Sequence, residues 1–205
     1  MTVQAVIWDL GNVLMRWDPE GYYDRTLGRD ARREMFAETG IEAMNLEIDR
    51  GAPWRDSVHA LADRHPAWAD AIRDWHDRWL DLTGGEIAGS VRLLSALRAG
   101  GVPVFALTNF GTETLALAER HYPSLADFDG RFVSGALGLV KPDPAIYAAV
   151  EDGTGIAPGA LLFVDDRPEN VAAAEARGWR GHVFDGPDGW ARRLRDEGLL
   201  AEDDA

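Results

Sequence analysis

Three short apolar runs, each ending in polar or acidic residues, place the strongest constraint on how this chain can fold. They cover residues 3–9 (VQAVIWD), 102–107 (VPVFAL) and 161–164 (LLFV). Each run is short and almost wholly apolar, which is typical of a strand buried on both faces of a sheet. The polar residues at their ends are Asp9, Thr108-Asn109 and Asp165-Asp166. We therefore expect three buried strands with polar carboxyl ends.

Helical patterns separate these runs. Segments with apolar residues at helical spacing lie at 86–99, 112–120, 143–151 and 169–177. A short strand near 180–184 and a helix near 187–198 are expected to complete the chain. Strands that alternate with helices predict an α/β fold, with a Rossmann-like parallel sheet covered by helices on both faces. Ligands bind at the carboxyl ends of the strands in such sheets, which is where the polar endings lie.

The region from 16 to 86 interrupts this alternation. It is rich in Trp, Arg and Asp, and its segments 54–65 and 67–82 carry apolar residues at helical spacing, with no convincing strand. An all-helical block inserted after the first strand is expected to form a cap. We predict a core of residues 1–15 and 87–205 and an α-helical cap of residues 16–86, with Thr83-Gly84-Gly85 as a hinge.

The composition narrows the choice of partners. The net charge is −14, which repels nucleic acid and anionic membranes. A small anionic metabolite stays compatible, since local donors and a bound cation can override the overall field. The absence of cysteine excludes disulfides, thiolate zinc sites and cysteine nucleophiles. No window approaches the roughly 18 apolar residues that span a bilayer, and no secretion signal is recognisable, so the expected location is the cytoplasm. The sequence does not indicate an oligomeric state.

Four segments carry the polar residues in a characteristic order. Asp9 stands in VIWDLGNVL, Thr108 in FALTNF, Lys141 in LVKPDPAIY, and the pair Asp165-Asp166 in FVDDRPENV. In order, strand context and spacing, these segments resemble the four motifs of the haloacid dehalogenase-like superfamily. The resemblance covers the whole chain, because these enzymes place a small helical cap after the first motif. It implies a hydrolase that uses Asp9 as a covalent nucleophile.

The residue types suit that chemistry. A carboxylate such as Asp9 can attack phosphorus and form an aspartyl-phosphate, which water then hydrolyses. Thr108 can donate a hydrogen bond to a phosphoryl oxygen and Lys141 can neutralise its charge, since phosphoryl transfer is catalysed mostly by positioning and electrostatics. Asp165 and Asp166 beside Asp9 would crowd three carboxylates, which is tolerable around a hard divalent cation with oxygen ligands. The expected cofactor is therefore Mg²⁺.

The resemblance extends this metal site beyond the carboxylates. It implies that the backbone carbonyl of Gly11 is a further ligand and that Asn170 braces the site from the following helix. Taken singly, each motif residue has a simpler explanation as a turn, cap or surface residue. Four such residues at one sheet edge favour the catalytic interpretation.

Gly11 also departs from the family pattern. Phosphatases of the superfamily usually carry a second aspartate there, which protonates the leaving oxygen and then activates water, and losing it typically costs about 10²–10⁴ in rate. Three alternatives are open. The leaving group needs little help, as with a sugar 1-phosphate, which we favour because DLGNVL resembles a subgroup of sugar-phosphate phosphatases. The second alternative is that Asp18 substitutes for the acid, unless it caps the helix after Pro19. The third is that the protein binds phosphorylated ligands with little turnover.

A 2-haloacid dehalogenase is the main alternative activity. Such enzymes use the same aspartate to displace halide, which leaves without a proton, so Gly11 does not argue against them. They typically work without a metal and lack the paired acids of the fourth motif, so Asp165-Asp166 favours a phosphatase. The sequence thus predicts a Mg²⁺-dependent phosphatase of a small phosphorylated metabolite.

The cap is expected to select the substrate. Its segment EIDRGAPW lies where the family has a specificity loop, so Arg50 and Trp54 are predicted substrate contacts. Asp18 and, in the core, Asn109 are assigned to substrate binding as well. Packing is an alternative role for Trp54, because the tryptophans of the cap are spaced to form an apolar seam.

Overall fold

The apolar runs form the centre of a five-stranded parallel sheet in the computed structural model, which describes residues 2–201. Its strands are β1 (Ala5–Trp8), β4 (Val104–Thr108), β5 (Gly130–Val133), β6 (Leu161–Asp165) and β7 (Arg180–Val183). The order across the sheet is β5-β4-β1-β6-β7, so β1 lies in the middle. Val6 is opposite Val104 on one side and Leu162 on the other. The three runs are therefore adjacent, and their polar ends share one edge. The edge strand β5 was not predicted, since GRFV is short and carries glycine and arginine.

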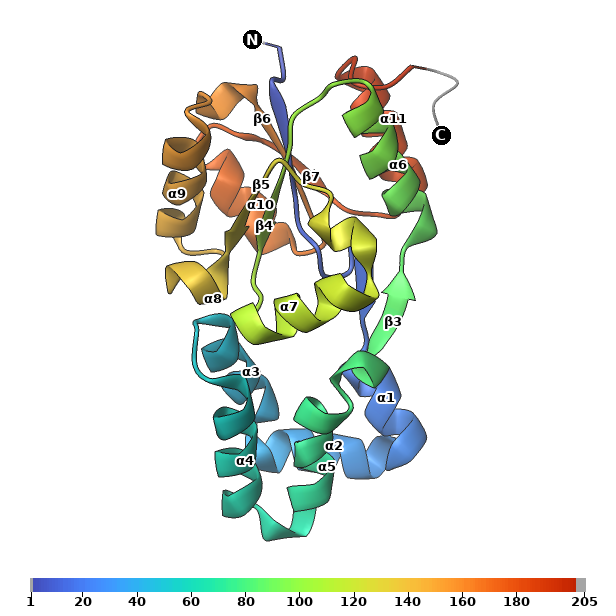
Figure 1. The fold of residues 1–205 in the computed structure, drawn as a ribbon, viewed down its shortest axis with the longest axis vertical. Coiled ribbons are helices and arrows are strands. Elements are labelled where there is room, and N and C mark those ends of the chain that lie inside the picture. Colours follow the sequence, from blue (N-terminus) through green and yellow to red (C-terminus); the bar gives the residue numbers. More distant parts are fainter. Residues whose placement is uncertain (1, 202–205) are drawn as a thin grey trace.

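Helices cover both faces of this sheet, as predicted. They are α6 (Ala88–Ala99), α7 (Thr112–His121), α8 (Ser134–Leu137), α9 (Pro144–Thr154), α10 (Pro168–Glu175) and α11 (Pro187–Asp196), with short 3₁₀ helices at Pro123–Ala126 and Pro158–Ala160. Val6 and Trp8 pack in one buried cluster with residues of α6, α7 and α11. Ala5 and Ile7 face the other way, into a cluster with α9 and α10. Successive residues of a strand point to opposite faces, which is why this strand must be apolar throughout. Figure 1 shows α6 and α11 on one side of the sheet and α9 on the other.

The chain between β1 and β4 forms the predicted helical cap. Its helices are α1 (Pro19–Thr26), α2 (Arg29–Thr39), α3 (Ile41–Asp49), α4 (Trp54–Arg64) and α5 (Ala69–Asp77), with 3₁₀ helices at Pro66–Trp68 and Trp79–Leu82. They pack around buried side chains such as Tyr23, Met35 and Ile72. Figure 1 shows the cap beyond the end at which the parallel strands finish. No helix within residues 2–201 is long and apolar enough to cross a bilayer.

Two short antiparallel strands join the cap to the core, and they correct the expectation that the cap region holds no strand. β2 (Met15–Trp17) pairs with β3 (Thr83–Glu86), so the presumed hinge at Thr83-Gly84-Gly85 is a paired strand. A Cβ on Gly84 would come within 2.8 Å of the Arg16 side chain, so glycine permits the close approach. Each strand is too short, and its partner too distant in the sequence, for a local pattern to reveal the pair.

Candidate active site

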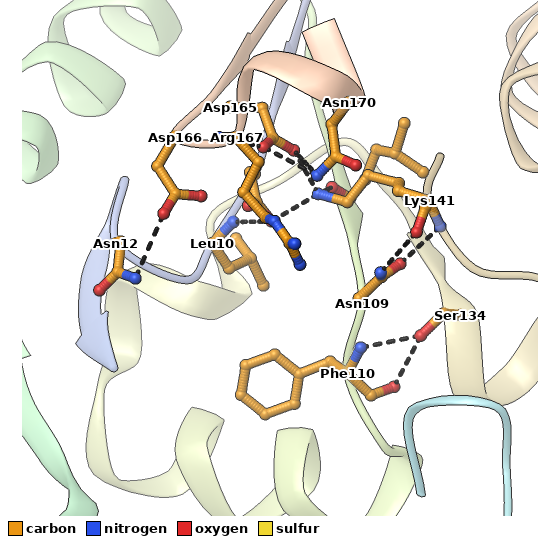
Figure 2. A network of polar contacts seen from close by, with 12 residues as sticks. Leu10, Asn12, Asn109, Phe110, Ser134, Lys141, Asp165, Asp166, Arg167 and Asn170 are labelled. Carbon is orange, nitrogen blue, oxygen red and sulfur yellow. Dashed lines mark hydrogen bonds and ion pairs between the residues drawn. The ribbon is translucent and has the colours of Figure 1, made fainter. Parts of the chain in front are cut away.

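A cavity of about 400 Å³ lies where the carboxyl ends of the strands meet the cap. Both parts of the molecule contribute to its wall. The predicted site residues that line it are Asp9, Gly11, Thr108, Asn109, Lys141, Asp166 and Asn170. Asp165 is completely buried directly behind this wall, in contact with Lys141 and Asn170. The four motifs therefore meet in one place, as Figure 2 shows for most of these residues.

Lys141 is the centre of a buried network of charges. Its Nζ lies 2.8 Å from Oδ1 of Asp9 and 2.6 Å from Oδ2 of Asp165, and it donates a third hydrogen bond to the carbonyl of Leu107 at 2.9 Å. The side chain of Asn109 holds the backbone of Lys141 from both sides, accepting from its N–H at 2.8 Å and donating to its carbonyl at 3.0 Å. Asn109 lines the cavity, but its side chain is engaged in positioning the lysine, which differs from the predicted substrate contact.

Asp165 is saturated with hydrogen bonds. Its Oδ1 accepts from the backbone N–H of Arg167 at 2.8 Å, and Nδ2 of Asn170 donates to Oδ1 at 2.9 Å and to Oδ2 at 3.0 Å. With Lys141 on Oδ2, each oxygen has two donors. The side chain of Asn170 therefore contacts Asp165 from α10, and the contacts of Asp165 suit a residue that fixes Lys141.

The electrostatics of this cluster show an excess of negative charge. Burial raises the pKa of Asp9 to about 7; the charge of Lys141 acts against this rise, and the smaller effects of the Asp165 and Asp166 charges add to it. Burial, followed by the charge of Asp165, raises the pKa of Asp166 as well. Burial opposes the charge on Lys141, but the two carboxylates beside it prevail and raise its pKa. One lysine does not neutralise three carboxylates.

The donor set fits a hard divalent cation. One oxygen from each of Asp9, Asp165 and Asp166 can be chosen so that all three lie within 4.8 Å of one another. The backbone N–H of Leu10 and Nζ of Lys141 both contact Oδ1 of Asp9, and Oδ2 of Asp166 accepts a long bond of 3.3 Å from Asn12. Carboxylate oxygens with a raised pKa, gathered at one point, are the environment that Mg²⁺ stabilises.

Thr108 ends β4 with almost no exposed surface, at the wall of the cavity. The loop that follows is held in place by Ser134, whose Oγ accepts from the backbone N–H of Phe110 at 2.8 Å. The helix α7 then begins at Thr112. A hydroxyl at a strand end followed by a helix N-terminus is a suitable site for an anionic oxygen.

Three predicted substrate contacts, Asp18, Arg50 and Trp54, do not line the cavity. Asp18 caps α1, accepting from the N–H of Gly21 at 2.9 Å, which is the alternative that the sequence left open. Arg50 is exposed and pairs with Glu47 at 2.6 Å. Trp54 is buried, and its Nε1 donates to the carbonyl of Trp75 at 3.3 Å. Capping, surface pairing and packing thus occupy the three side chains, and their positions do not favour the predicted roles.

The cap wall contains residues that the sequence did not single out for the site. Rings of Trp17, Trp75 and Trp79 line it, with Trp17 centred 5.7 Å from Trp75 and 5.5 Å from Trp79. Phe110 of the core also lines the cavity, and its ring is centred 5.7 Å from that of Trp79. Asp49, at the end of α3, also lines the cavity. The available signal for Asp49 was its place in EIDRGAPW, the segment in which its neighbour Arg50 was chosen instead.

Comparison with known proteins agrees with this geometry. The family described as haloacid dehalogenase-like hydrolase matches residues 3–178. A sesquiterpene phosphatase of Aspergillus oryzae is 30% identical over 203 residues, which cover 90% of this chain and 91% of the relative. The crystal structure of a HAD family enzyme from Bacteroides thetaiotaomicron, in complex with magnesium and inorganic phosphate, has a TM-score of 0.75 at 22% identity, covering 94% of this chain and 100% of that one.

The same fold also occurs in a dehalogenase. An L-2-haloacid dehalogenase from Xanthobacter autotrophicus, with chloropropionic acid covalently bound, has a TM-score of 0.61 at 18% identity, covering 98% of this chain and 85% of that one. The two structural likenesses therefore concern the fold. With its motifs assembled at one sheet edge beneath a helical cap, the chain belongs to the haloacid dehalogenase-like hydrolases.

Proposed function

We propose that the protein is a Mg²⁺-dependent phosphatase that works through an aspartyl-phosphate on Asp9. The observation that carries this proposal is the buried cluster of Asp9, Asp165 and Asp166 around a single lysine. With one lysine for three carboxylates, the cluster is two positive charges short, which is the charge that a divalent cation would supply.

Each residue has a distinct part in the proposed reaction. Asp9 and Asp166 would hold Mg²⁺ through their carboxylate oxygens, with the carbonyl of Gly11 as the further ligand that the family resemblance implies. The ion would supply charge neutralisation for the phosphoryl oxygens. Asp9 attacks phosphorus in line, and Lys141 keeps it ionised and oriented through their 2.8 Å contact. Thr108 donates its hydroxyl to a phosphoryl oxygen. Asp165 holds Lys141 in place.

The acidic cluster also weighs against a dehalogenase. Halide displacement creates no need for a metal, and Asp166 would then be a half-buried carboxylate with a raised pKa and no cation to stabilise it. A protein that only binds phosphorylated ligands would not need Asp9 held against a buried lysine. Hydrolysis through Asp9 uses every one of these groups.

The cap wall suggests the class of substrate. Three tryptophan rings of the cap, together with Phe110 of the core, line the cavity, and such rings favour apolar or flat groups. A sesquiterpene phosphatase is among the relatives of this chain. We therefore propose a phosphate monoester whose organic part is apolar. A sugar 1-phosphate, which the sequence motif favours, would have to take the partners for its hydroxyls from polar lining residues such as Glu42, Asn45 and Asp49.

Phosphate release from a small panel tests the proposal. The panel is p-nitrophenyl phosphate, farnesyl monophosphate and glucose 1-phosphate, each assayed with Mg²⁺ and with EDTA. We expect Mg²⁺-dependent release that falls by about 10⁴-fold or more in Asp9→Asn, because the nucleophile is lost. Asp152→Asn, an exposed acid outside the cavity, is the matched control and should retain full activity.

Two results would overturn the proposal. One is chloride release from 2-chloropropionate that is indifferent to EDTA, which would identify a dehalogenase. The other is tight binding of the phosphate esters without any turnover that depends on Asp9. Efficient hydrolysis of glucose 1-phosphate but not of farnesyl monophosphate would overturn only the substrate class.

A further inference from the structure

An open space lies beside the nucleophile where the superfamily's phosphatases usually carry a proton donor. Gly11 lines the cavity two residues after Asp9, and a Cβ placed on it would meet no atom within 4 Å. The glycine is therefore not required by crowding. An alkoxide leaving group still needs a proton, because general acid assistance is typically worth about 10²–10⁴ in rate. Another group facing the same space has to supply it.

Four acids line this cavity: Asp9, Glu42, Asp49 and Asp166. Asp9 and Asp166 belong to the carboxylate cluster. Glu42 is exposed in the first turn of α3. The candidate that remains is Asp49, half-buried at the other end of the same helix. Asp18, which the sequence suggested as a substitute acid, caps α1 outside the cavity.

The backbone of the cap is pressed against the core next to Asp49. A Cβ on Gly111 would come within 2.7 Å of Cγ2 of Ile48, and a Cβ on Gly51 would come within 2.7 Å of the carbonyl oxygen of Gly135. Gly51 also has a φ of +104°, which a side chain would strain. These glycines let the end of α3 lie directly on the loop that follows Thr108. Asp49 is therefore held over the site by packing of the backbone.

The carboxyl group of Asp49 is also oriented. Nδ2 of Asn45 donates to its Oδ2 at 3.1 Å, and Nε1 of Trp75 donates to Oδ1 of Asn45 at 2.9 Å, which fixes the amide. All three side chains line the cavity. Asn45 is thus a positioning residue, and the chain from Trp75 to Asp49 gives the carboxyl one direction.

The surroundings of Asp49 suit a group that exchanges protons near neutrality. Burial raises its pKa to about 7, although the backbone N–H of Gly111 and the charge of Lys141 act in the opposite direction. The other charged groups of the cavity wall are Asp9, Glu42, Asp166 and Arg167. A general acid is most effective when its pKa lies near the working pH.

We propose that Asp49 reaches from the cap to act as the general acid and base of the reaction, in place of the side chain that Gly11 lacks. This inference rests on the proposed phosphatase function. In the first step Asp9 bonds to phosphorus, the bond from phosphorus to the leaving oxygen breaks, and Asp49 gives its proton to that oxygen. In the second, the Asp49 carboxylate takes a proton from water as the water oxygen attacks phosphorus. Asp9 is released as a carboxylate, and phosphate leaves.

The dependence of kcat/KM on the pKa of the leaving group tests this role. The probes are p-nitrophenyl phosphate, whose leaving group needs no proton, and farnesyl monophosphate, whose alcohol does. For the parent, kcat/KM should depend only weakly on the pKa of the leaving group. Asp49→Asn should leave kcat/KM for the aryl ester within about threefold and lower it for the alkyl ester by about 10²-fold or more. Since the base is lost too, the variant should release a burst of nitrophenol equal to the enzyme concentration.

Two further variants separate this role from a structural one. Gly11→Asp introduced into Asp49→Asn should restore the alkyl ester activity, because it places an acid in the open space beside Asp9. Glu47 is an exposed acid on the same helix, and Glu47→Gln should leave kcat/KM unchanged for both esters. Equal losses on both esters, or no loss on the alkyl ester, would overturn the role of Asp49. Loss of all Mg²⁺-dependent release in the parent would instead overturn the phosphatase itself.

Discussion

The two walls of the cavity hold their polar groups in different ways. On the core wall, Lys141 has three acceptors and Asp165 has four donor contacts, so each charge is fixed by several bonds. On the cap wall, aromatic rings form much of the surface, and Asp49 has one side-chain donor, the amide of Asn45, besides the backbone N–H of Gly111. A charge network resists substitution, whereas a packed wall can be reshaped. We therefore expect the core to fix the nucleophile and its counter-charges, and the cap to shape the space for the substrate and to hold Asp49.

Lys141→Met is the most severe test of the core wall. It would leave Asp9 and Asp165 buried without their cation, and breaking a buried ion pair typically costs about 3–5 kcal/mol. We expect the free energy of unfolding, measured in urea with EDTA at pH 8, to fall by that order. Phosphate release should fall for every substrate, by about 10²–10³-fold or more. A variant as stable as the parent would show that the core network is no more rigid than the cap.

Asp166→Asn tests whether the core wall is completed by a metal. Ligand binding stabilises a protein by about 2.7 kcal/mol when the ligand is at 100 times its Kd. Mg²⁺ should therefore raise the Tm of the parent, and Asp166→Asn should lose this rise. Without metal the variant should be at least as stable as the parent, because it removes a carboxylate whose pKa is raised by burial. Asp152→Asn is the control and should keep the full response. If Mg²⁺ raised the Tm of Asp166→Asn as much as that of the parent, Asp166 would not be a metal ligand.

The core wall was largely predictable from the sequence. Asp9, Thr108 and Asp165 each end a buried parallel strand, and parallel strands finish at the same edge. Lys141 could be added through the resemblance of its motif. The clamp between Asn109 and the backbone of Lys141 could not, since it joins positions 32 residues apart without any local pattern.

The cap wall was far less predictable. Helical periodicity indicates which residues of the cap are buried. It does not indicate which of these buried residues lie at the surface of the cap that faces the core. Trp54 was a candidate for substrate contact or for packing, and it packs on His76 and Trp79. Trp17 instead lines the cavity from a strand that no pattern predicted. Asp49 stands beside the predicted Arg50, and the direction of each side chain depends on how α3 docks on the loop at Gly111.

Trp17→Leu sharpens the contrast between the walls. Trp17 is half-buried between Trp75 and Trp79, so leucine keeps the apolar surface but removes the ring contacts. Aromatic pairs are worth about 0.5–1.5 kcal/mol beyond their buried area. We expect KM for farnesyl monophosphate to rise by up to about tenfold with little change in kcat, and the constants for acetyl phosphate to stay within about twofold. Equal changes for both esters would mean that the ring supports the fold and does not select substrate.

Asp49→Asn has the smallest expected effect on stability, and its dependence on pH distinguishes the walls. Burial raises the pKa of Asp49 from 3.8 to about 7. At pH 3 the carboxyl is largely protonated in the folded and unfolded states alike. Between pH 4 and 7 the unfolded chain releases its proton first, so the free energy of unfolding falls as the pH rises, and above pH 7 the loss is constant. Asparagine cannot ionise and avoids this loss.

The free energy of unfolding of Asp49→Asn should therefore increase relative to that of the parent as the pH rises. A shift of one pKa unit corresponds to about 1.4 kcal/mol for a fully buried group. Because Asp49 is partly exposed, solvent screening reduces this value. We therefore expect the free energy of unfolding of the variant to increase relative to the parent by on the order of 1 kcal/mol between pH 3 and pH 8. Urea unfolding with EDTA measures it, and Glu47→Gln should show no such gain. Asp9 titrates in both proteins, so its contribution cancels in the comparison. A gain that does not depend on pH would show that the Asp49 carboxyl is solvated, and the cap would then contribute packing alone.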